Sequence, residues 1–363
     1  MRNYLLKFAC LLLCTGFLFS CSDDGDVYVT DVFMSDMNGA YVINYGNWGK
    51  GGSSVSQFDY TDSVMTNNFY ASVNGKELTG NIEYAYNYND QTFIIENSPD
   101  QIITLNDTLA QLKNGVSLEN PRACVGYGDY IYISCWGSTP DYNLMADSYI
   151  AKYNIKTMTV EKEISLPGGP EGVEIANGKL YAALNYKNSV AVINIAGDNA
   201  VSYIETPAVC SYFVKDDDDN LYVSLINTYS NPSSYTGLGY IDTDKDNITN
   251  YELANVSSSY SQIMAVNNDK SKIYVIAASY ENWSLVGGVS VFNTESKTFE
   301  SESLISNISG ADAIAVNPYN DDIYLTTSLS FTDPGALNVY GKEGTFKNTY
   351  TAGVSPNHVI FLN

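Results

Sequence analysis

The chain has 363 residues, of which 18 are basic and 41 acidic, giving a formal net charge of −23. So acidic a surface repels nucleic acid and anionic lipid, which excludes nucleic-acid binding. Tyrosine is unusually common, at 31 residues, and Val, Ile, Thr and Ser are abundant, a composition that favours an all-β fold.

The first twenty residues have the features of an export signal. Arg2 and Lys7 give a positive start, and the apolar run Leu5–Phe19 is too short for a comfortable membrane span. A small residue directly before Cys21 is typical of a lipobox, which predicts cleavage there and acylation of the Cys21 thiol. An ordinary signal peptide with an incidental cysteine is the alternative. We therefore expect residues 1–20 to be a lipoprotein signal peptide.

The residues after Cys21 favour a tether. The acidic segment 22–26 resembles the signal that sends lipoproteins of the Bacteroidota to the outer face of the outer membrane. We expect residues 21–38 to be a polar, lipid-anchored tether, and the lipid to be the only contact with the membrane. Without Arg2 and Lys7 the mature chain carries a charge of about −25.

Three cysteines remain in the expected mature chain besides the lipid site. Cys124, Cys135 and Cys210 lack the short CxxC spacing of a zinc site. Cys124 and Cys135 flank a predicted hairpin, so a disulfide between them is one interpretation in an oxidising compartment. Two buried free thiols are the other.

A short apolar strand that begins with an aromatic residue recurs along the chain. The spacings lie between 39 and 52 residues, near the length of one four-stranded blade. Seven such copies predict a seven-bladed β-propeller over residues 39–363; another repeating all-β fold, such as two sandwiches, is the alternative. The copies begin at Tyr41, Phe93, Tyr132, Tyr181, Tyr222, Tyr274 and Tyr324.

The fourth copy predicts the strands of one blade. Gly172–Ala176 is expected to be the inner strand, and Asn177-Gly178 is a tight-turn signal. Lys179–Leu184, Ser189–Ile195 and Ala200–Glu205 follow as the second, third and outer strands.

The two ends of the repeat complement each other. Residues 354–363 resemble an inner strand with no second strand after it, and the Tyr41 strand has no inner strand before it. Pairing the C-terminal strand into the N-terminal blade would close the ring and remove both exposed edges.

The expected ligand site lies in the loops between the second and third strands, which share one face with the connectors between blades. These loops are rich in aromatic residues, whereas the hairpins of the opposite face are short and polar. A broad aromatic patch marks a binding face, although packing between blades is the alternative for any single ring. The aromatic residues are Tyr45, Trp48, Trp136, Tyr142, Tyr186, Tyr229, Tyr235, Tyr280, Trp283 and Phe331.

The connectors add polar groups to the same face, namely Arg122, Glu171, Asp312, Asn357 and His358. His358 is the only histidine, and it is expected at the mouth of the central channel, either contacting a ligand or satisfied within the closing strand. By alignment it takes the place that Gly172, Cys124 and Asp312 hold in other blades.

A single histidine argues against several of the activities that propellers have. Metal sites built from several imidazoles cannot form, and no GxSxG motif supports a Ser-His-Asp triad. We expect neither a metal nor a cofactor, and a binding protein rather than an enzyme. A carboxylate pair of the glycosidase kind stays open, because 41 acidic residues offer many pairs.

The lipobox, the Tyr-rich repeat and the unit from Gly168 to Val173 resemble the YncE-like/DUF5074 propeller lipoproteins of Bacteroidota. Within that group the chain resembles surface proteins that capture vitamin B12. The resemblance implies an outer-membrane lipoprotein at the cell surface that binds a corrinoid and passes it to a TonB-dependent transporter. A glycan-binding lipoprotein of a polysaccharide-uptake system is the second interpretation, and a propeller lyase or lactonase is the third.

Overall fold

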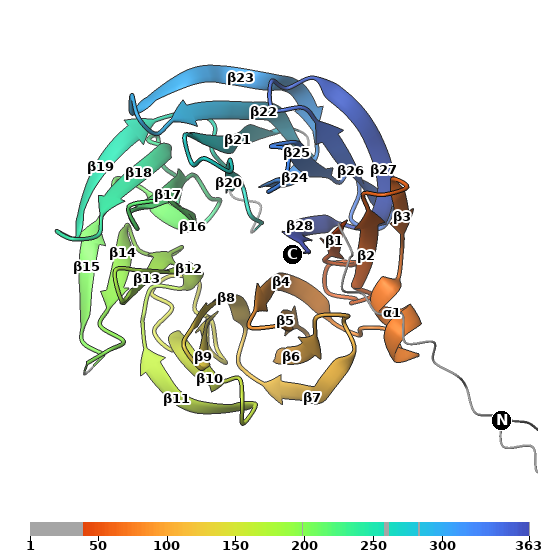
Figure 1. The fold of residues 1–363 in the computed structure, drawn as a ribbon. Helices are drawn as coiled ribbons and strands as arrows, with labels where there is room; N and C mark the ends of the chain where they lie inside the picture. The colour runs from red at the N-terminus through yellow and green to blue at the C-terminus, as the bar shows by residue number, and fades with distance from the viewer. Residues whose placement is uncertain (1–38, 198, 258–260, 282–283, 363) are drawn as a thin grey trace, which may run out of the picture. The chain divides into compact units, whose positions relative to one another are not determined.

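The computed structural model describes residues 39–197, 199–257, 261–281 and 284–362. These residues form seven four-stranded antiparallel sheets around one axis, with one strand of each sheet next to the centre (Figure 1). The predicted all-β, seven-bladed propeller is confirmed.

Each blade is numbered by the order of its repeat in the chain, and its strands run from the centre outward. Blade 1 contains β28 (Pro356–Phe361), β1 (Gly39–Asn44), β2 (Ser54–Asp59) and β3 (Val64–Thr66). Blade 2 contains β4 (Asn81–Tyr88), β5 (Gln91–Asn97), β6 (Gln101–Asn106) and β7 (Gln111–Ser117), and α1 (Phe69–Asn74) precedes it. Blade 3 contains β8 (Pro121–Tyr127), β9 (Tyr130–Cys135), β10 (Tyr149–Asn154) and β11 (Thr159–Ser165).

The remaining blades repeat this order. Blade 4 contains β12 (Pro170–Ala176), β13 (Lys179–Leu184), β14 (Ser189–Ile193) and β15 (Val201–Glu205). Blade 5 contains β16 (Val209–Lys215), β17 (Leu221–Ile226), β18 (Gly237–Asp242) and β19 (Asn247–Glu252). Blade 6 contains β20 (Met264–Val266), β21 (Lys272–Glu281), β22 (Ser284–Asn293) and β23 (Thr298–Ser309). Blade 7 contains β24 (Ala311–Val316), β25 (Ile323–Thr327), β26 (Pro334–Tyr340) and β27 (Phe346–Val354).

The predicted strands of blade 4 all form, with small shifts at their ends. Asn177 and Gly178 both have positive φ, at 47° and 69°, as a tight hairpin turn requires. The inner strand begins at Pro170, two residues earlier than expected, because an irregular pairing between Pro170 and Val173 extends it.

The ring closes as predicted. β28 pairs with β1 antiparallel, with Val359 opposite Val42, so the first and last parts of the described chain share one blade. Every residue of β1 is buried, because β28 covers one edge of this strand and β2 the other. Closure therefore removes the free inner edge that β1 would otherwise expose.

The recurring tyrosine joins neighbouring blades. Its ring is buried between sheets, and in four copies its hydroxyl reaches the outer hairpin of the next blade. A buried tyrosine needs a partner for its hydroxyl, which these hairpins supply. The pairs are Tyr41 with the Asp107 carbonyl (3.4 Å), Tyr181 with the Asp246 carboxylate (2.6 Å), Tyr222 with the Lys297 ammonium, and Tyr274 with the Lys342 carbonyl (3.4 Å).

Of the two interpretations of Cys124 and Cys135, buried free thiols are the one that the structure has. Cys124 and Cys135 are free and buried, because Cys124 lies opposite Ile133 while Cys135 lies opposite Pro121. The strand pairing shifts between these two positions, so the cysteines are not cross-strand neighbours. Burial raises the pKa of both thiols, which keeps them protonated and unreactive.

The expected signal peptide (1–20), the lipid anchor Cys21 and the tether (21–38) lie outside the described residues. Among the helices of the described residues, none is long and apolar enough to cross a membrane.

Candidate functional site

One backbone position recurs at the same end of all seven inner strands. In each blade, the residue that follows the repeat aromatic pairs with a residue of the inner strand, and the recurring position lies two residues before that partner. In blade 3, for example, Ile133 follows the repeat aromatic and pairs with Cys124, so the position is held by Arg122. A polar side chain stands here in every blade. We call this set the mouth ring: Glu83, Arg122, Glu171, Ser211, Gln262, Asp312 and Asn357.

A break in the strand pairing sets this position apart. In six of the seven inner strands, all but β20, the register with the second strand shifts at the mouth-ring residue. In blade 3 the Ser134 hydroxyl bonds the Ala123 amide nitrogen at 3.0 Å and the Glu171 carbonyl at 2.5 Å, which satisfies backbone left unpaired there. Bulges of this kind are common at rims and next to binding sites, where they redirect side chains.

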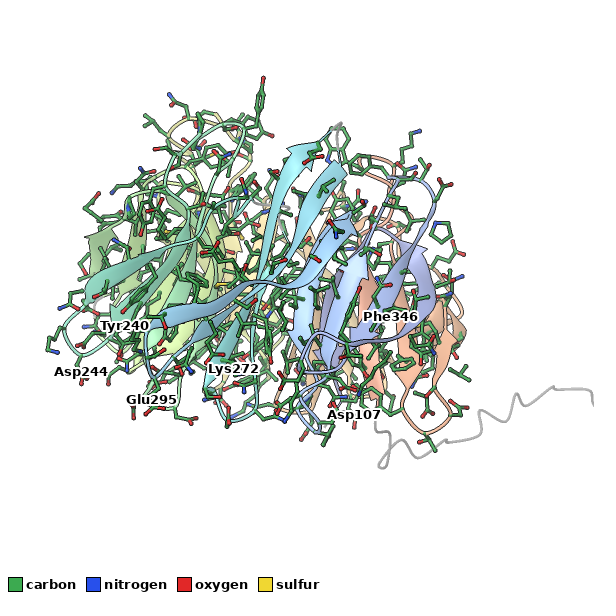
Figure 2. All side chains as sticks on the ribbon, turned by 90° about the horizontal axis from the view of Figure 1, so that it is seen from above. Asp107, Tyr240, Asp244, Lys272, Glu295 and Phe346 are labelled. Atoms are coloured by element: carbon green, nitrogen blue, oxygen red, sulfur yellow. The ribbon has the colours of Figure 1, made fainter. Side chains whose placement is uncertain are left out.

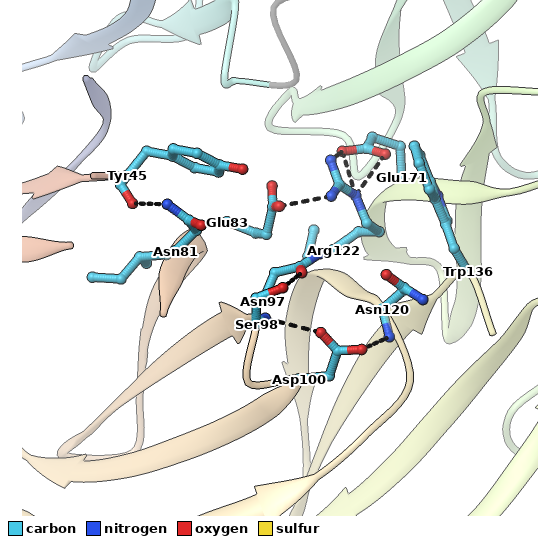
Figure 3. Close-up of polar contacts among 12 residues, drawn as sticks. Tyr45, Asn81, Glu83, Asn97, Ser98, Asp100, Asn120, Arg122, Trp136 and Glu171 are labelled. Atoms are coloured by element: carbon cyan, nitrogen blue, oxygen red, sulfur yellow. Dashed lines mark hydrogen bonds and ion pairs between the residues drawn. The ribbon is translucent and has the colours of Figure 1, made fainter. Parts of the chain in front are cut away.

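Three adjacent mouth-ring residues form a buried ion cluster, which we call the mouth triad. Arg122 Nη1 lies 2.9 Å from Glu83 Oε1, and its Nε and Nη2 bond the Glu171 carboxylate at 3.1–3.3 Å. Figure 3 shows the two carboxylates on opposite sides of the guanidinium. The three side chains come from blades 2, 3 and 4, so the triad ties three blades together at the channel mouth.

Burial changes the protonation of the acidic groups. It raises the pKa of Glu83 to about 7, although Arg122 acts in the opposite direction. It also raises the pKa of Glu171, again opposed by Arg122, and that of Asp312 to about 7. Burial disfavours the charge on Arg122 too, but Glu171 and Glu83 outweigh this and hold the pKa of Arg122 well above its usual value. Burial thus raises the pKa of two mouth-ring carboxyls, Glu83 and Asp312, toward neutral pH.

Two of the aromatic residues predicted to contact a ligand, Trp136 and Tyr186, pack over the mouth triad. The Trp136 ring lies 4.4 Å from the Arg122 guanidinium carbon and donates from Nε1 to the Pro170 carbonyl at 3.1 Å. Tyr186 meets Trp136 edge-on, with ring centres 5.4 Å apart, and Met145 completes this buried cluster. Trp136 and Tyr186 thus support Arg122 through a cation–π contact and apolar packing.

A layer of three rings lies one residue further along the inner strands. Tyr84 stacks on Tyr212 with ring centres 6.3 Å apart and also contacts His358, with ring centres 4.5 Å apart. At the same position in blade 4, Gly172 leaves room for Tyr212, since a Cβ there would lie 2.4 Å from the Ser211 carbonyl oxygen. The rings thus come from blades 1, 2 and 5 and meet directly behind the mouth ring.

The predicted place of His358 is partly wrong. It does correspond to Gly172, but in blades 3 and 7 its equivalents are Ala123 and Ala313 rather than Cys124 and Asp312. The sequence alignment missed the extra residue that each register shift introduces. His358 is buried, and burial lowers its pKa to about 4, so its ring is neutral at physiological pH.

Two side-chain atoms at the closing strand lack partners within the described residues. They are Asn357 Oδ1 and His358 Nδ1, both buried. The Asn357 amide nitrogen does bond the Ile82 and Glu83 carbonyls, at 3.0 and 3.3 Å, which ties blade 1 to blade 2. The described residues contain no cluster of three metal-ligating side chains.

The face around the mouth ring carries the most exposed apolar side chains of the described chain. We call it the loop face, because it carries the loops between second and third strands; Asp107, Asp244 and Glu295 mark hairpins on the opposite edge, the hairpin face (Figure 2). The seven most exposed large apolar residues, 60% or more exposed, all lie on the loop face, and the others are at most 57% exposed. The seven are Trp48, Tyr142, Leu144, Tyr229, Tyr280, Leu329 and Phe331.

The remaining expected ligand residues lie in two settings. Trp48, Tyr229, Tyr280 and Phe331 are on the exposed rim, and Trp283 lies outside the described residues. Arg122, Glu171, Asn357 and His358 are buried at the channel mouth, and Tyr45 is half-buried, with its ring directed toward Glu83 (Figure 3).

Sequence reasoning missed Glu83, Tyr84 and Tyr212. These residues lie inside apolar strands, without the Pro or Gly that marked the other connectors. An alignment anchored on the repeat aromatics, allowing one extra residue in each inner strand, would have found them.

The arrangement defines a closed propeller whose one face combines exposed aromatic rings with a polar ring, five of whose seven residues are buried. Residues 38–352 match the family described as "Domain of unknown function (DUF5074)", and the chain belongs to that family. A search of curated proteins found no match.

Solved structures share the fold at low sequence identity. A quinonprotein alcohol dehydrogenase-like protein from Bacteroides thetaiotaomicron has a TM-score of 0.66 and 17% identity, over 90% of this chain and 78% of that one. A putative 6-phosphogluconolactonase from Bacteroides fragilis has a TM-score of 0.65 and 10% identity, and the periplasmic gluconolactonase of Pseudomonas aeruginosa has 0.64 and 12%. Both of these matches cover 90% of this chain and 99% of the other. At such identities the likeness concerns the fold alone.

Proposed function

We propose that the protein is a surface lipoprotein that captures a large amphipathic ligand, a corrinoid such as vitamin B12, on the loop face. The observation that carries this proposal is the segregation of the seven most exposed apolar side chains onto that one face. They come from blades 1, 3, 5, 6 and 7, so residues distant in sequence form one rim. Large apolar side chains that are exposed together on one face favour a binding site there.

The polar groups behind the rim suit the same ligand. A corrinoid is a rigid disc with amide arms, so it needs apolar contact over its faces and hydrogen bonds around its edge. Rim aromatics supply contact area at low entropy cost, and the half-buried Gln262 and Asp312 of the mouth ring supply an amide and a carboxyl group. A rigid ligand on a rigid scaffold loses little ordering entropy, which favours high affinity.

The described groups favour binding over catalysis. Glu83 and Glu171 are both engaged with Arg122, and the single histidine is buried and neutral. In the proposal, acylated Cys21 anchors the protein at the outer face of the outer membrane, and a TonB-dependent transporter takes the ligand from the loop face. A Cys21→Ala variant should then leave the membrane fraction, whereas a variant that stays with the membrane would contradict the lipid anchor.

Titration of the mature protein with cyanocobalamin, followed by calorimetry and visible absorbance, tests the ligand. We expect saturable binding that Phe331→Ala weakens about tenfold, roughly 1.4 kcal/mol. Phe346→Ala is the matched control, because Phe346 is similarly exposed but lies on the hairpin face. Absence of cyanocobalamin binding, together with binding of neutral glycans at the loop face, would favour the glycan interpretation instead.

A further inference from the structure

A groove lies away from the loop face, where blades 7 and 1 meet. β27 of blade 7 lies beside β2 and β3 of blade 1 (Figure 1). Between them, at the hairpin face, is a groove of about 480 Å³, a volume in the range of small-molecule sites. We call it the seam groove; its lining comprises Phe58, Tyr60, Ser63, Asn317, Tyr319, Asn320, Asp322, Tyr324, Val339, Lys347, Asn348 and Tyr350.

The floor of the seam groove is aromatic. The Phe58 ring lies 4.5 Å from Tyr350, 5.7 Å from Tyr60 and 6.1 Å from Tyr324, measured between ring centres. Because these rings pack on one another, they hold a fixed shape. Tyr319 stands at the rim and, at 57%, is the most exposed large apolar residue of the described chain outside the loop face. Phe58 and Tyr324 are buried, whereas Tyr60 and Tyr350 are half-buried, so the rings that a flat ligand can stack on are Tyr60, Tyr350 and the exposed Tyr319.

The polar groups at the groove are amides and one neutralised pair. Lys347 Nζ lies 2.5 and 2.7 Å from the two carboxylate oxygens of Asp322, so neither charge is left unbalanced. The exposed amides of Asn320 and Asn348 already donate to Asp322 and Tyr350, at 3.2 and 3.0 Å, and each accepts one backbone N–H. Each amide keeps one further N–H donor and one further acceptor site for a ligand. The groove therefore presents rings and neutral amides, within a protein whose net charge of −23 repels anions.

We propose that the seam groove binds a neutral oligosaccharide. A pyranose ring has an apolar C–H face that stacks on tyrosine, and hydroxyls at its edge that pair with amides. Both kinds of group line the groove, and the net charge disfavours acidic glycans. The site is separate from the proposed corrinoid face, because it lies on the hairpin side of the ring. A saccharide here contacts blades 7 and 1 together and stabilises the closure of the ring.

Calorimetric titration of the mature protein with cellohexaose, maltohexaose and mannohexaose tests the proposal, with hexagalacturonic acid as the acidic comparison. We expect at least one neutral hexaose to bind and to raise the melting temperature, and the acidic one to bind more weakly. Tyr319→Ala should weaken the neutral hexaose at least tenfold. Tyr319 is exposed, so this variant folds, which the unliganded melting temperature verifies.

The controls separate the seam groove from the loop face. Tyr229→Ala should leave hexaose binding unchanged, and Tyr319→Ala should leave cyanocobalamin binding unchanged. No binding of any neutral hexaose at millimolar concentration overturns the proposal, as does hexaose binding that survives Tyr319→Ala. Tighter binding of hexagalacturonic acid overturns the assignment of a neutral ligand.

Discussion

The mouth ring has the same backbone position in every blade but two kinds of chemistry. In blades 2–4 it holds the mouth triad, where Arg122 bonds Glu83 and Glu171 beneath Trp136. In blades 5, 6, 7 and 1 it holds Ser211, Gln262, Asp312 and Asn357, without a second cation. The repeat therefore sets the backbone position of the mouth-ring residue, while the residue type in each blade sets its charge and its contacts. One sector is locked by ion pairs, and the rest presents uncharged or single acidic groups.

Removal of the central cation should have the largest effect. Arg122→Ala leaves Glu83 and Glu171 buried without their partner, a change that typically costs about 3–5 kcal/mol. Urea denaturation of the mature protein at pH 7 measures this loss in the free energy of unfolding. Gln262→Ala, at the same position in blade 6, is the matched control and should cost no more than about 1 kcal/mol. Equal losses in the two variants would show that the sectors do not differ.

The layer behind the mouth ring offers a smaller test. Gly172→Ala places a Cβ 2.4 Å from the Ser211 carbonyl oxygen and against Tyr212, so backbone must move. Overpacking of this kind costs about 1–3 kcal/mol. Ala313→Gly, at the equivalent position in blade 7, should cost about 1 kcal/mol or less by its effect on chain entropy. If Gly172→Ala were neutral by urea denaturation, the tight contact between blades 4 and 5 would be disproved.

The mouth ring and the layer of rings behind it also show which features can be predicted from the sequence and which cannot. The repeat aromatics predicted the ring and its closure, because burial between sheets imposes the same residue type in each copy. Arg122 and Glu171 were found because Pro121 and Pro170 mark their connectors. Glu83 was missed because it lies between Ile82 and Tyr84 and reads as an ordinary strand residue. Its role arises from a register shift, which depends on tertiary pairing and leaves no local signal.

The aromatic loops show the same limit. Loop position placed Trp48, Tyr229 and Phe331 correctly on the loop face. It did not distinguish them from Trp136 and Tyr186, which come from neighbouring blades and are buried against each other and Met145. Residue type and position along the repeat specify the face, and loop conformation then decides which rings reach solvent.

Asp312 should give the mouth ring a pH-dependent stability. Its pKa is raised by burial to about 7, against roughly 3.9 in an unfolded chain. Between these values the folded protein holds a proton that the unfolded chain has lost, so this group's contribution to stability falls as pH rises and is gone above pH 7. Asp312→Asn cannot ionise. The variant should therefore gain stability relative to the parent as pH rises from 5 to 8, by at most about 1.4 kcal/mol per pH unit.

Urea denaturation of both chains at pH 5, 6, 7 and 8 measures that difference. The pKa of His358 is lowered to about 4, so its contribution to stability rises with pH between that value and its unfolded pKa. Because His358 is present in both chains, its effect cancels in the comparison. A difference that stays constant across the series would contradict a raised pKa at Asp312.

The smallest effect on stability is expected where the two faces are compared directly. Tyr229 on the loop face and Tyr319 on the hairpin face are both largely exposed, so replacing either by Ala should change the free energy of unfolding by less than about 0.5 kcal/mol. Each variant should nevertheless lose the binding of one ligand and keep that of the other. Tyr229→Ala should weaken cyanocobalamin but not a neutral hexaose, and Tyr319→Ala should do the reverse. Calorimetric titration of each variant with both ligands measures this difference. A variant that loses both ligands would mean that the two faces are not independent sites.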